Sequence, residues 1–168
     1  PLWAQELYNP NEHVPETEEY GITSWVYRAC EPFNPTKIYS FFNREWPGVI
    51  RAKGFFWLSS RPDFVGEVSQ AGAFVRHQGI GRWWASIPKE RWPDPVAVEE
   101  VTRKYWTSEY GDRRQEIVFI GLKDQMNEDD IRNTLDACLV NEYLSSPEVF
   151  QKLEDQCSSC NSVDIIIS

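Results

Sequence analysis

The chain lacks the sequence motifs that many nucleotide-using and hydrolytic enzymes share. No Gly-x-x-x-x-Gly-Lys-Ser/Thr phosphate loop occurs in the 168 residues, so no backbone cradle for a triphosphate is encoded. Neither a dinucleotide fingerprint nor a Gly-x-Ser-x-Gly nucleophile elbow is present. Only two histidines occur, His13 and His77, which leaves few candidates for a histidine-based triad. We therefore expect no catalytic residues and no bound cofactor in this chain.

Long apolar runs and a surplus of positive charge are also missing. No segment is long and apolar enough to span a membrane, and the start shows no signal-peptide pattern. The lack of such a run predicts no membrane partner, and the net charge of −9, which repels phosphate backbones, predicts no nucleic-acid partner. Cysteine is scarce, and the local patterns around Cys30 and Cys138 predict two small core residues. The simplest interpretation is a cytoplasmic protein in a reducing compartment.

The other two cysteines, Cys157 and Cys160, form a CxxC pair near the end of the sequence. Two thiolates at this spacing can bind one Zn²⁺, but a closed site needs two further ligands. His13, in the polar N-terminal stretch, or His77 could complete the site only if the fold brought it close. The alternative is a flexible reduced tail with an unligated histidine, or a disulfide formed on handling.

The sequence is rich in residues that can form a hydrophobic core. Hydrophobic residues make up 41% and aromatics 14%, including eight tryptophans, which argues against disorder. Prolines and acidic residues predict a linker or arm at 1–20, after which a compact domain begins near Gly21. The chain begins with Pro1 rather than Met, which suggests a fragment or a processed product.

Periodicity predicts an α+β fold. Alternation and β-branched residues predict strands at 22–29, 49–59, 65–75, 82–87 and 113–122, with a turn at 79–81. On the second strand we expect the even positions, including Ile50, to form the buried face. Capping residues predict helices beginning near 35, 95, 127 and 147. Because most strands follow one another without a helical crossover, we expect a largely antiparallel sheet with helices packed on one face.

Charged residues lie at the N-terminal end of the last predicted strand, just after a predicted helix. Arg113, Arg114 and Glu116 precede or open this strand, and Glu67 lies on an earlier one. Paired across the sheet, the four side chains would form an ion-pair network that orients an interface. Exposed ion pairs contribute only about 0–1 kcal/mol, so stability alone is a weak reason for them. The alternative is a set of ordinary charges at a strand end.

Several blocks of the sequence together resemble one known family, over roughly residues 12–142. The blocks are Gly21-Ile22 with Val26-Tyr27-Arg28 and Pro32-Phe33, Trp46 to Trp57, Val65 to Gly72, Gly81-Arg82-Trp83-Trp84-Ala85, Gly111 to Gly121, and Leu135-Asp136-Ala137-Cys138-Leu139. In this combination the chain resembles the C-terminal domain of the CobW family, whose members are GTP-dependent metal chaperones. The resemblance implies a family-like domain at 21–142 and leaves an extra helix with a CxxC-bearing tail, at 143–168, outside the pattern.

The resemblance implies a larger protein with an N-terminal GTPase domain, where GTP would bind. This chain would dock on that domain and help to deliver zinc or cobalt to a client protein, without hydrolysing GTP itself. One alternative is a protein-interaction module that needs no metal. A second is a small independent enzyme, which would require Glu67, His77 or Arg113 to converge in a pocket.

Overall fold

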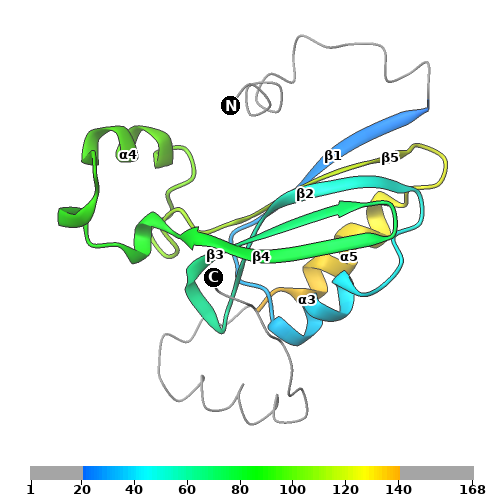
Figure 1. Ribbon diagram of the computed structural model, residues 1–168, viewed down its shortest axis with the longest axis horizontal. Coiled ribbons are helices and arrows are strands. Elements are labelled where there is room, and N and C mark those ends of the chain that lie inside the picture. The colour runs from blue at the N-terminus through cyan, green and yellow to red at the C-terminus, as the bar shows by residue number, and fades with distance from the viewer. Residues whose placement is uncertain (1–20, 141–168) are drawn as a thin grey trace.

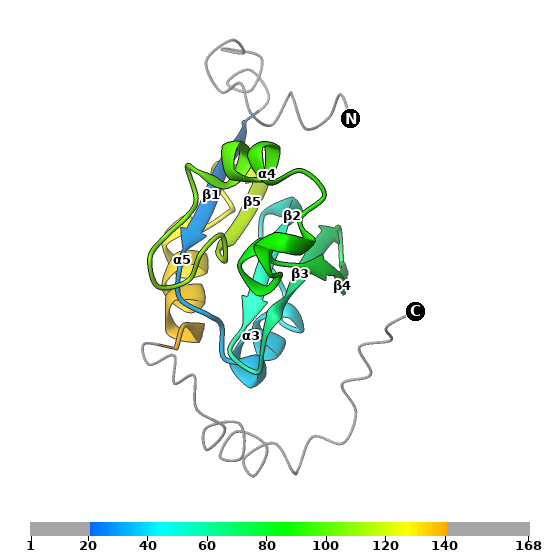
Figure 2. The same cartoon turned by 90° about the vertical axis from the view of Figure 1, so that its left-hand side faces the viewer.

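The computed structural model describes residues 21–140 and contains one five-stranded antiparallel sheet. The strands are β1 (Ile22–Ala29), β2 (Val49–Leu58), β3 (Arg61–Ala71), β4 (Phe74–Arg82) and β5 (Gln115–Leu122). Their order across the sheet is β1-β5-β2-β3-β4, which Figure 2 shows from one end of the sheet. The last strand in sequence therefore lies between the first two, and β1 and β4 are the edges.

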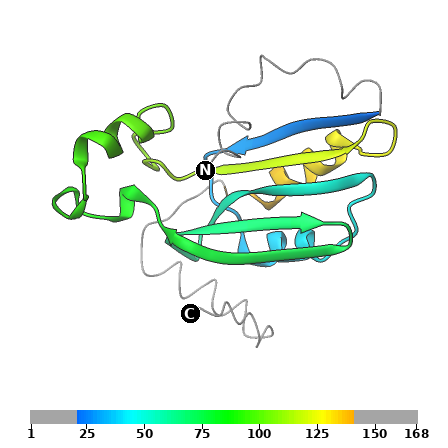
Figure 3. The same cartoon turned by 45° about the horizontal axis from the view of Figure 1, so that its top comes forward.

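Two helices cover one face of this sheet. α3 (Pro35–Phe42) and α5 (Glu128–Cys138) both lie behind the strands in Figure 3. A third helix, α4 (Pro95–Thr102), lies beyond the end of the sheet with the segments around it (Figure 1). We call residues 83–114, which connect β4 to β5, the lobe. The predicted α+β class, antiparallel sheet and one-sided helices are confirmed.

The sequence sets the three helix starts locally. Side-chain oxygens of Asn34, Asp94 and Asn127 accept hydrogen bonds from backbone N–H groups three residues later, at 3.1, 3.1 and 3.0 Å. Proline follows the first two caps, where its fixed φ suits the first helical position. The predicted starts near 35, 95 and 127 are confirmed, whereas the one predicted near 147 lies outside the described residues, as do the segments 1–20 and 143–168. No helix within residues 21–140 is long and apolar enough to cross a membrane.

The main core lies between the sheet and the two helices. Its centre is aromatic: the Trp46 ring lies 4.8 Å from Phe41 and 5.7 Å from Phe119, between centroids. The Trp46 indole N–H donates to the Phe41 carbonyl at 2.9 Å, which satisfies its polar group inside the core. Cys138 is buried as predicted, but Cys30 is exposed because β1 ends one residue before it.

The third predicted strand, at 65–75, is wrong because it spans the turn of a hairpin. Gly72 has a φ of 59°, a left-handed conformation that glycine adopts without strain, and it ends β3. The predicted turn at 79–81 is instead part of β4. There the register shifts, with Val65 opposite Gly81 and Gly66 opposite Gly79, so that Ile80 forms a bulge. Gly79 and Gly81, which predicted a turn, flank this bulge instead.

Two further expectations fail for identifiable reasons. The predicted strand at 82–87 is a 3₁₀ turn over Trp84–Ser86, because the buried Asp112 carboxylate accepts hydrogen bonds from the Trp84 and Ala85 N–H groups at 3.1 and 2.9 Å. Ile50, expected on the buried face, is 44% exposed. A register shift between Val49 and Arg51 turns it away from the core.

Candidate functional site

The face of the sheet opposite α3 and α5 carries the charged residues that the sequence singled out. Three rows of aligned residues cross all five strands on this side, in the order β1-β5-β2-β3-β4. We call these fifteen residues the open face: Arg28-Glu116-Phe55-Glu67-Gln78, Val26-Val118-Lys53-Ser69-Arg76 and Ser24-Ile120-Arg51-Ala71-Phe74. None of them is buried, whereas residues on the opposite face, such as Tyr27, Ile117 and Val68, are almost completely inaccessible.

Glu116 is the most tightly held carboxylate of the open face. Its Oε2 lies 2.7 Å from Nε of Arg114, and its Oε1 accepts from Nε and Nη2 of Arg28 at 3.3 and 3.2 Å. Its side chain is only 12% exposed, while that of Arg28 is 63% exposed. Two guanidinium groups thus fix the carboxylate of Glu116 between β1 and the entry of β5.

Glu67 belongs to a separate ion pair. Its Oε1 lies 3.2 Å from Nζ of Lys53, and its Oε2 accepts a hydrogen bond from Gln78 at 3.1 Å. Phe55 stands between Glu67 and Glu116 in the same row of the sheet. The predicted single network of four side chains is therefore wrong, because an aromatic residue divides the charges into two groups.

Arg113 lies apart from both groups and joins the lobe to the sheet. Its Nε donates to the Pro62 carbonyl at 2.7 Å and its Nη1 to the Tyr110 carbonyl at 3.0 Å, while Asp63 lies 3.7 Å from Nη2. Its side chain is 15% exposed. The carbonyls of Pro62 and Tyr110 belong to the start of β3 and to the lobe, so Arg113 holds the two together.

Arg114 has a double role. Besides binding Glu116, its guanidinium lies 3.8 Å from the centroid of the Tyr105 ring, a cation–π contact with the lobe. Next to it Trp57, Trp83 and Tyr110 form a second hydrophobic cluster, and burial raises the pKa of the Tyr110 hydroxyl to about 12. The lobe is therefore packed against the end of the sheet at which Arg114 and Glu116 lie.

Two buried polar residues that position this region were missed by the sequence analysis. Gln115 is fully buried, and its amide bonds to backbone groups of Trp57 and Glu31. Asp112, 4% exposed, holds the 3₁₀ turn of the lobe. Gln115 could have been found from the sequence, because it is a polar residue at an inward-facing position of an otherwise apolar strand. Asp112 precedes that strand and gives no such signal.

The residues required by the enzyme alternative do not converge. His77 lies on the helix-covered side of β4, where its ring stacks 5.6 Å from Phe42, so it is half-buried rather than simply exposed. Burial lowers the pKa of its imidazole. Glu67 lies on the open face, and Arg113 is bonded to the lobe. No constellation of these three groups is present to support catalysis.

The predicted metal ligands Cys157, Cys160 and His13 lie outside the described residues. Between residues 21 and 140, no cluster of three or more His, Cys, Asp or Glu side chains could hold a metal ion. The thiol pair therefore stays a prediction for zinc or cobalt binding.

Comparison with known proteins gives the family. Residues 22–139 match the family model described as the cobalamin synthesis protein cobW C-terminal domain. The chain belongs to this family. The match covers the whole sheet and the three α-helices of the described part of the chain, and it ends one residue before the last described residue.

Among curated proteins, the zinc-regulated GTPase metalloprotein activator 1 of Dictyostelium discoideum is 37% identical over 145 residues, which is 84% of this chain and 30% of that protein. The zinc chaperone Rv0106 of Mycobacterium tuberculosis is 28% identical over 135 residues, covering 77% and 32% of the two chains. This CobW C-terminal domain thus spans about a third of the length of these curated relatives. Among solved structures, the Zn(II)-bound YjiA GTPase from E. coli is 14% identical, with a TM-score of 0.46 over 78% of this chain and 34% of that one.

Proposed function

We propose that this chain is the accessory C-terminal part of a GTP-hydrolysing metal chaperone that delivers zinc to a client protein. The observation that carries the proposal is the family match over residues 22–139, together with the 37% identity to a zinc-regulated GTPase metalloprotein activator. GTP binding and hydrolysis would belong to another part of the parent protein, because this chain contains no phosphate loop. Zinc is cargo in this scheme, and cobalt is the alternative metal.

We further propose that the open face docks on the GTPase domain. Antiparallel sheets can leave one face in water, and this one mixes half-buried apolar residues with charges, as interdomain contacts do. Arg51 and Arg76 have no ion-pair partner among residues 21–140, so they are available for carboxylates of the docking domain. Glu116 and Glu67, held by their own cations, would orient the contact.

Arg113 and Arg114 contribute to the proposed interface by holding the lobe in place beside the open face. Their contacts with Tyr110 and Tyr105 fix the position of the lobe relative to Glu116. A docking domain would then meet the sheet and the lobe as one preformed surface. Such preorganisation lowers the entropic cost of association.

The test is binding in trans between this chain and the GTPase portion of the parent protein, expressed as a separate chain. Calorimetry with GDP and with a slowly hydrolysed GTP analogue measures the affinity in each state. The double variant Arg51→Glu/Arg76→Glu is expected to weaken binding at least about tenfold, since each change replaces an attraction by a repulsion.

The double variant Lys37→Glu/Lys123→Glu is the matched control, because both lysines are exposed, lie outside the open face and the lobe, and give the same total charge change. Its affinity should equal that of the unmodified chain. Absence of a complex in both nucleotide states would overturn the docking proposal. Equal weakening by the control and by the open-face variant would move the interface away from the open face.

A further inference from the structure

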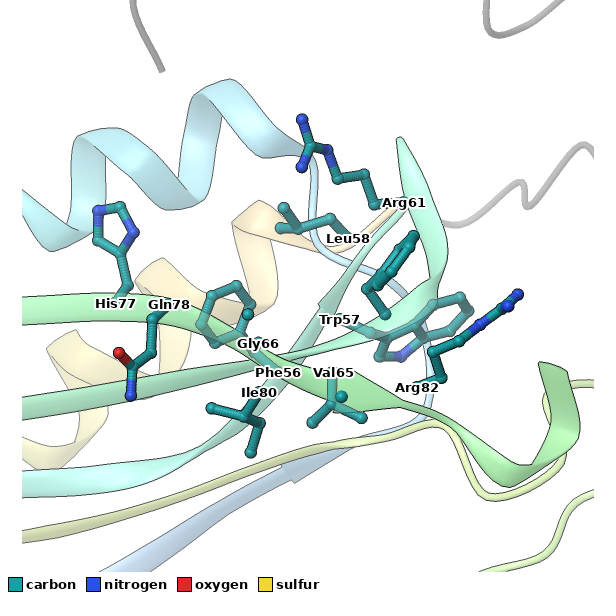
Figure 4. A pocket seen from close by; sticks show the side chains of 13 residues that line it. Phe56, Trp57, Leu58, Arg61, Val65, Gly66, His77, Gln78, Ile80 and Arg82 are labelled. Carbon is teal, nitrogen blue, oxygen red and sulfur yellow. The ribbon is translucent and has the colours of Figure 1, made fainter. Parts of the chain in front are cut away.

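An apolar groove lies at the end of the β3–β4 hairpin remote from its turn, and of the open-face rows only Gln78 contributes to its lining. It has a volume of about 290 Å³, and its wall includes Leu58, Phe64, Val65 and Ile80. Figure 4 shows Leu58, Arg61 and His77 projecting toward the side of α3, with Val65 and Ile80 projecting from the other side of the two strands. Phe64 and Ile80 are 45% and 47% exposed, so the groove leaves large apolar side chains in water.

The backbone of the hairpin creates this groove. Gly79 and Gly81 flank the Ile80 bulge, and a Cβ at either position would meet no atom within 4 Å. At Gly66 the reverse holds, because a Cβ would lie 2.5 Å from the Phe56 ring. Two positions on this part of β4 thus carry no side chain, while the Phe56 ring packs closely against Gly66 of β3.

The rim of the groove is positively charged. Arg61 is exposed and has no ion-pair partner among the described residues, and Arg82 pairs with Asp63 at 3.1 Å. His77 stands at the opposite end of the lining, half-buried against α3. An occupant that combines apolar side chains with carboxylates would match both the wall and the rim.

The chain itself leaves the described fold beside this groove. The Val140 N–H donates to the Pro32 carbonyl at 2.9 Å, and Leu139 forms a bridge with Phe33. Phe33 forms a second bridge with Leu58, a residue of the groove wall. Leu139, next to the last described residue, is therefore linked through Phe33 to Leu58 in the groove wall.

We propose that the groove is the docking site of the chain's own C-terminal segment, residues 141–156. Behind Ser146-Pro147, this segment carries Val149, Phe150 and Leu153 at helical spacing, and its carboxylates are Glu142, Glu148, Glu154 and Asp155. Phe150 would enter the apolar groove, and the acidic residues would face the Arg61 end of the rim. The segment lies beyond the matched family region, which ends at residue 139, so the docking would be an addition to the family domain.

Connectivity makes this occupant more favourable than a free peptide. Phe150 is the tenth residue after Val140, and an extended chain covers about 3.3 Å per residue, so the segment can reach any part of the groove. A short tether of this kind raises the effective concentration of the segment to roughly the millimolar range. A weak apolar contact is then sufficient for occupancy. Docking would also cover the edge of β4 and keep other strands from pairing with it.

The experiment is photo-crosslinking in the complete 168-residue chain. Phe64, in the groove wall, is replaced by the photoreactive residue p-benzoylphenylalanine, and crosslinked peptides are identified by mass spectrometry. Mixing isotopically light and heavy chains separates contacts within one chain from contacts between copies. The same label at Val101, which is 67% exposed on α4, is the control for non-specific capture.

We expect crosslinks within one chain from position 64 to residues 141–156, and none from position 101. Adding Phe150→Ala or Arg61→Glu should lower the yield at least about tenfold, with an unchanged circular dichroism spectrum. Absence of crosslinks to 141–156 would overturn the proposal, and so would a yield that neither substitution changes. Mixed light–heavy crosslinks would assign the groove to a second copy of the chain instead.

Discussion

Replacing Gln115 tests how the end of the sheet is held in place. The side chain is fully buried, and its Nε2 donates to the carbonyls of Glu31 and Trp57 at 2.8 and 3.0 Å. Its Oε1 accepts the Trp57 N–H at 3.0 Å. Gln115→Met keeps the length of the side chain and removes all three hydrogen bonds, so the change is mainly one of polarity.

The loss of stability in Gln115→Met is estimated from the backbone groups that the glutamine amide binds. The Trp57 carbonyl keeps a bond from the Phe33 N–H at 3.0 Å, but the Trp57 N–H loses the Gln115 Oε1 acceptor in a residue that is 0% exposed. The half-buried Glu31 carbonyl can recover part of its loss from water. An unsatisfied buried polar group costs about 1–3 kcal/mol, so we expect a loss of about 2–4 kcal/mol. For a domain of this size the melting temperature falls by roughly 3–5 °C per kcal/mol, or about 10 °C in total.

A second substitution, Gln115→Glu, gives the same site a pH dependence. The new carboxylate can accept the Trp57 N–H, but it faces the Glu31 and Trp57 carbonyls, which need donors. Burial and these oxygens raise the pKa of the new carboxyl above its unfolded value of about 4.3. The folded state then binds the proton more tightly than the unfolded state. The loss of folding stability in Gln115→Glu is therefore small near pH 4 and grows as the pH rises.

Thermal and urea unfolding, followed by circular dichroism at pH 4.5 and pH 7.5, measure both effects. A Gln115→Met variant that loses less than about 1 kcal/mol would refute the reasoning, because the Trp57 N–H would then be satisfied in some other way. A Gln115→Glu variant whose cost does not change between the two pH values would show that the new carboxyl reaches solvent.

Three further predictions concern ligands and pH. Calorimetry should detect no GTP binding to this chain, since it lacks a phosphate loop, and micromolar affinity would contradict its role as the accessory part. The reduced chain is expected to bind zinc through Cys157 and Cys160. A zinc affinity that does not change in Cys157→Ser/Cys160→Ser would contradict this and would leave zinc binding to the GTPase domain. Because burial lowers the pKa of His77, its protonation opposes folding, and thermal stability should decline as the pH falls through about 6.5. In His77→Phe this decline should be shallower; an equal slope would exclude His77 as its source.

The sequence by itself determined the local structure. Helix starts follow from Asn34, Asp94 and Asn127, because a capping oxygen, joined in the first two by a following proline, acts within one turn. The strands at the two ends of the domain follow from alternation, and the family follows from the spacing of several blocks. Each of these signals is contained in a short stretch of sequence, so no tertiary information is needed to interpret it.

The tertiary structure decided which residues lie opposite one another. Ile80 is a bulge rather than a turn because Gly66 and Gly79 pair across the hairpin, a contact that the local sequence does not encode. The ion pairs of Glu116 and Glu67 are separate because β2 places Phe55 between them. The groove likewise exists only once β2 lies beside the bulged β3–β4 hairpin, since its wall comes from all three strands. Register and packing depend on contacts between distant segments, so the sequence fixes these features only through the complete fold.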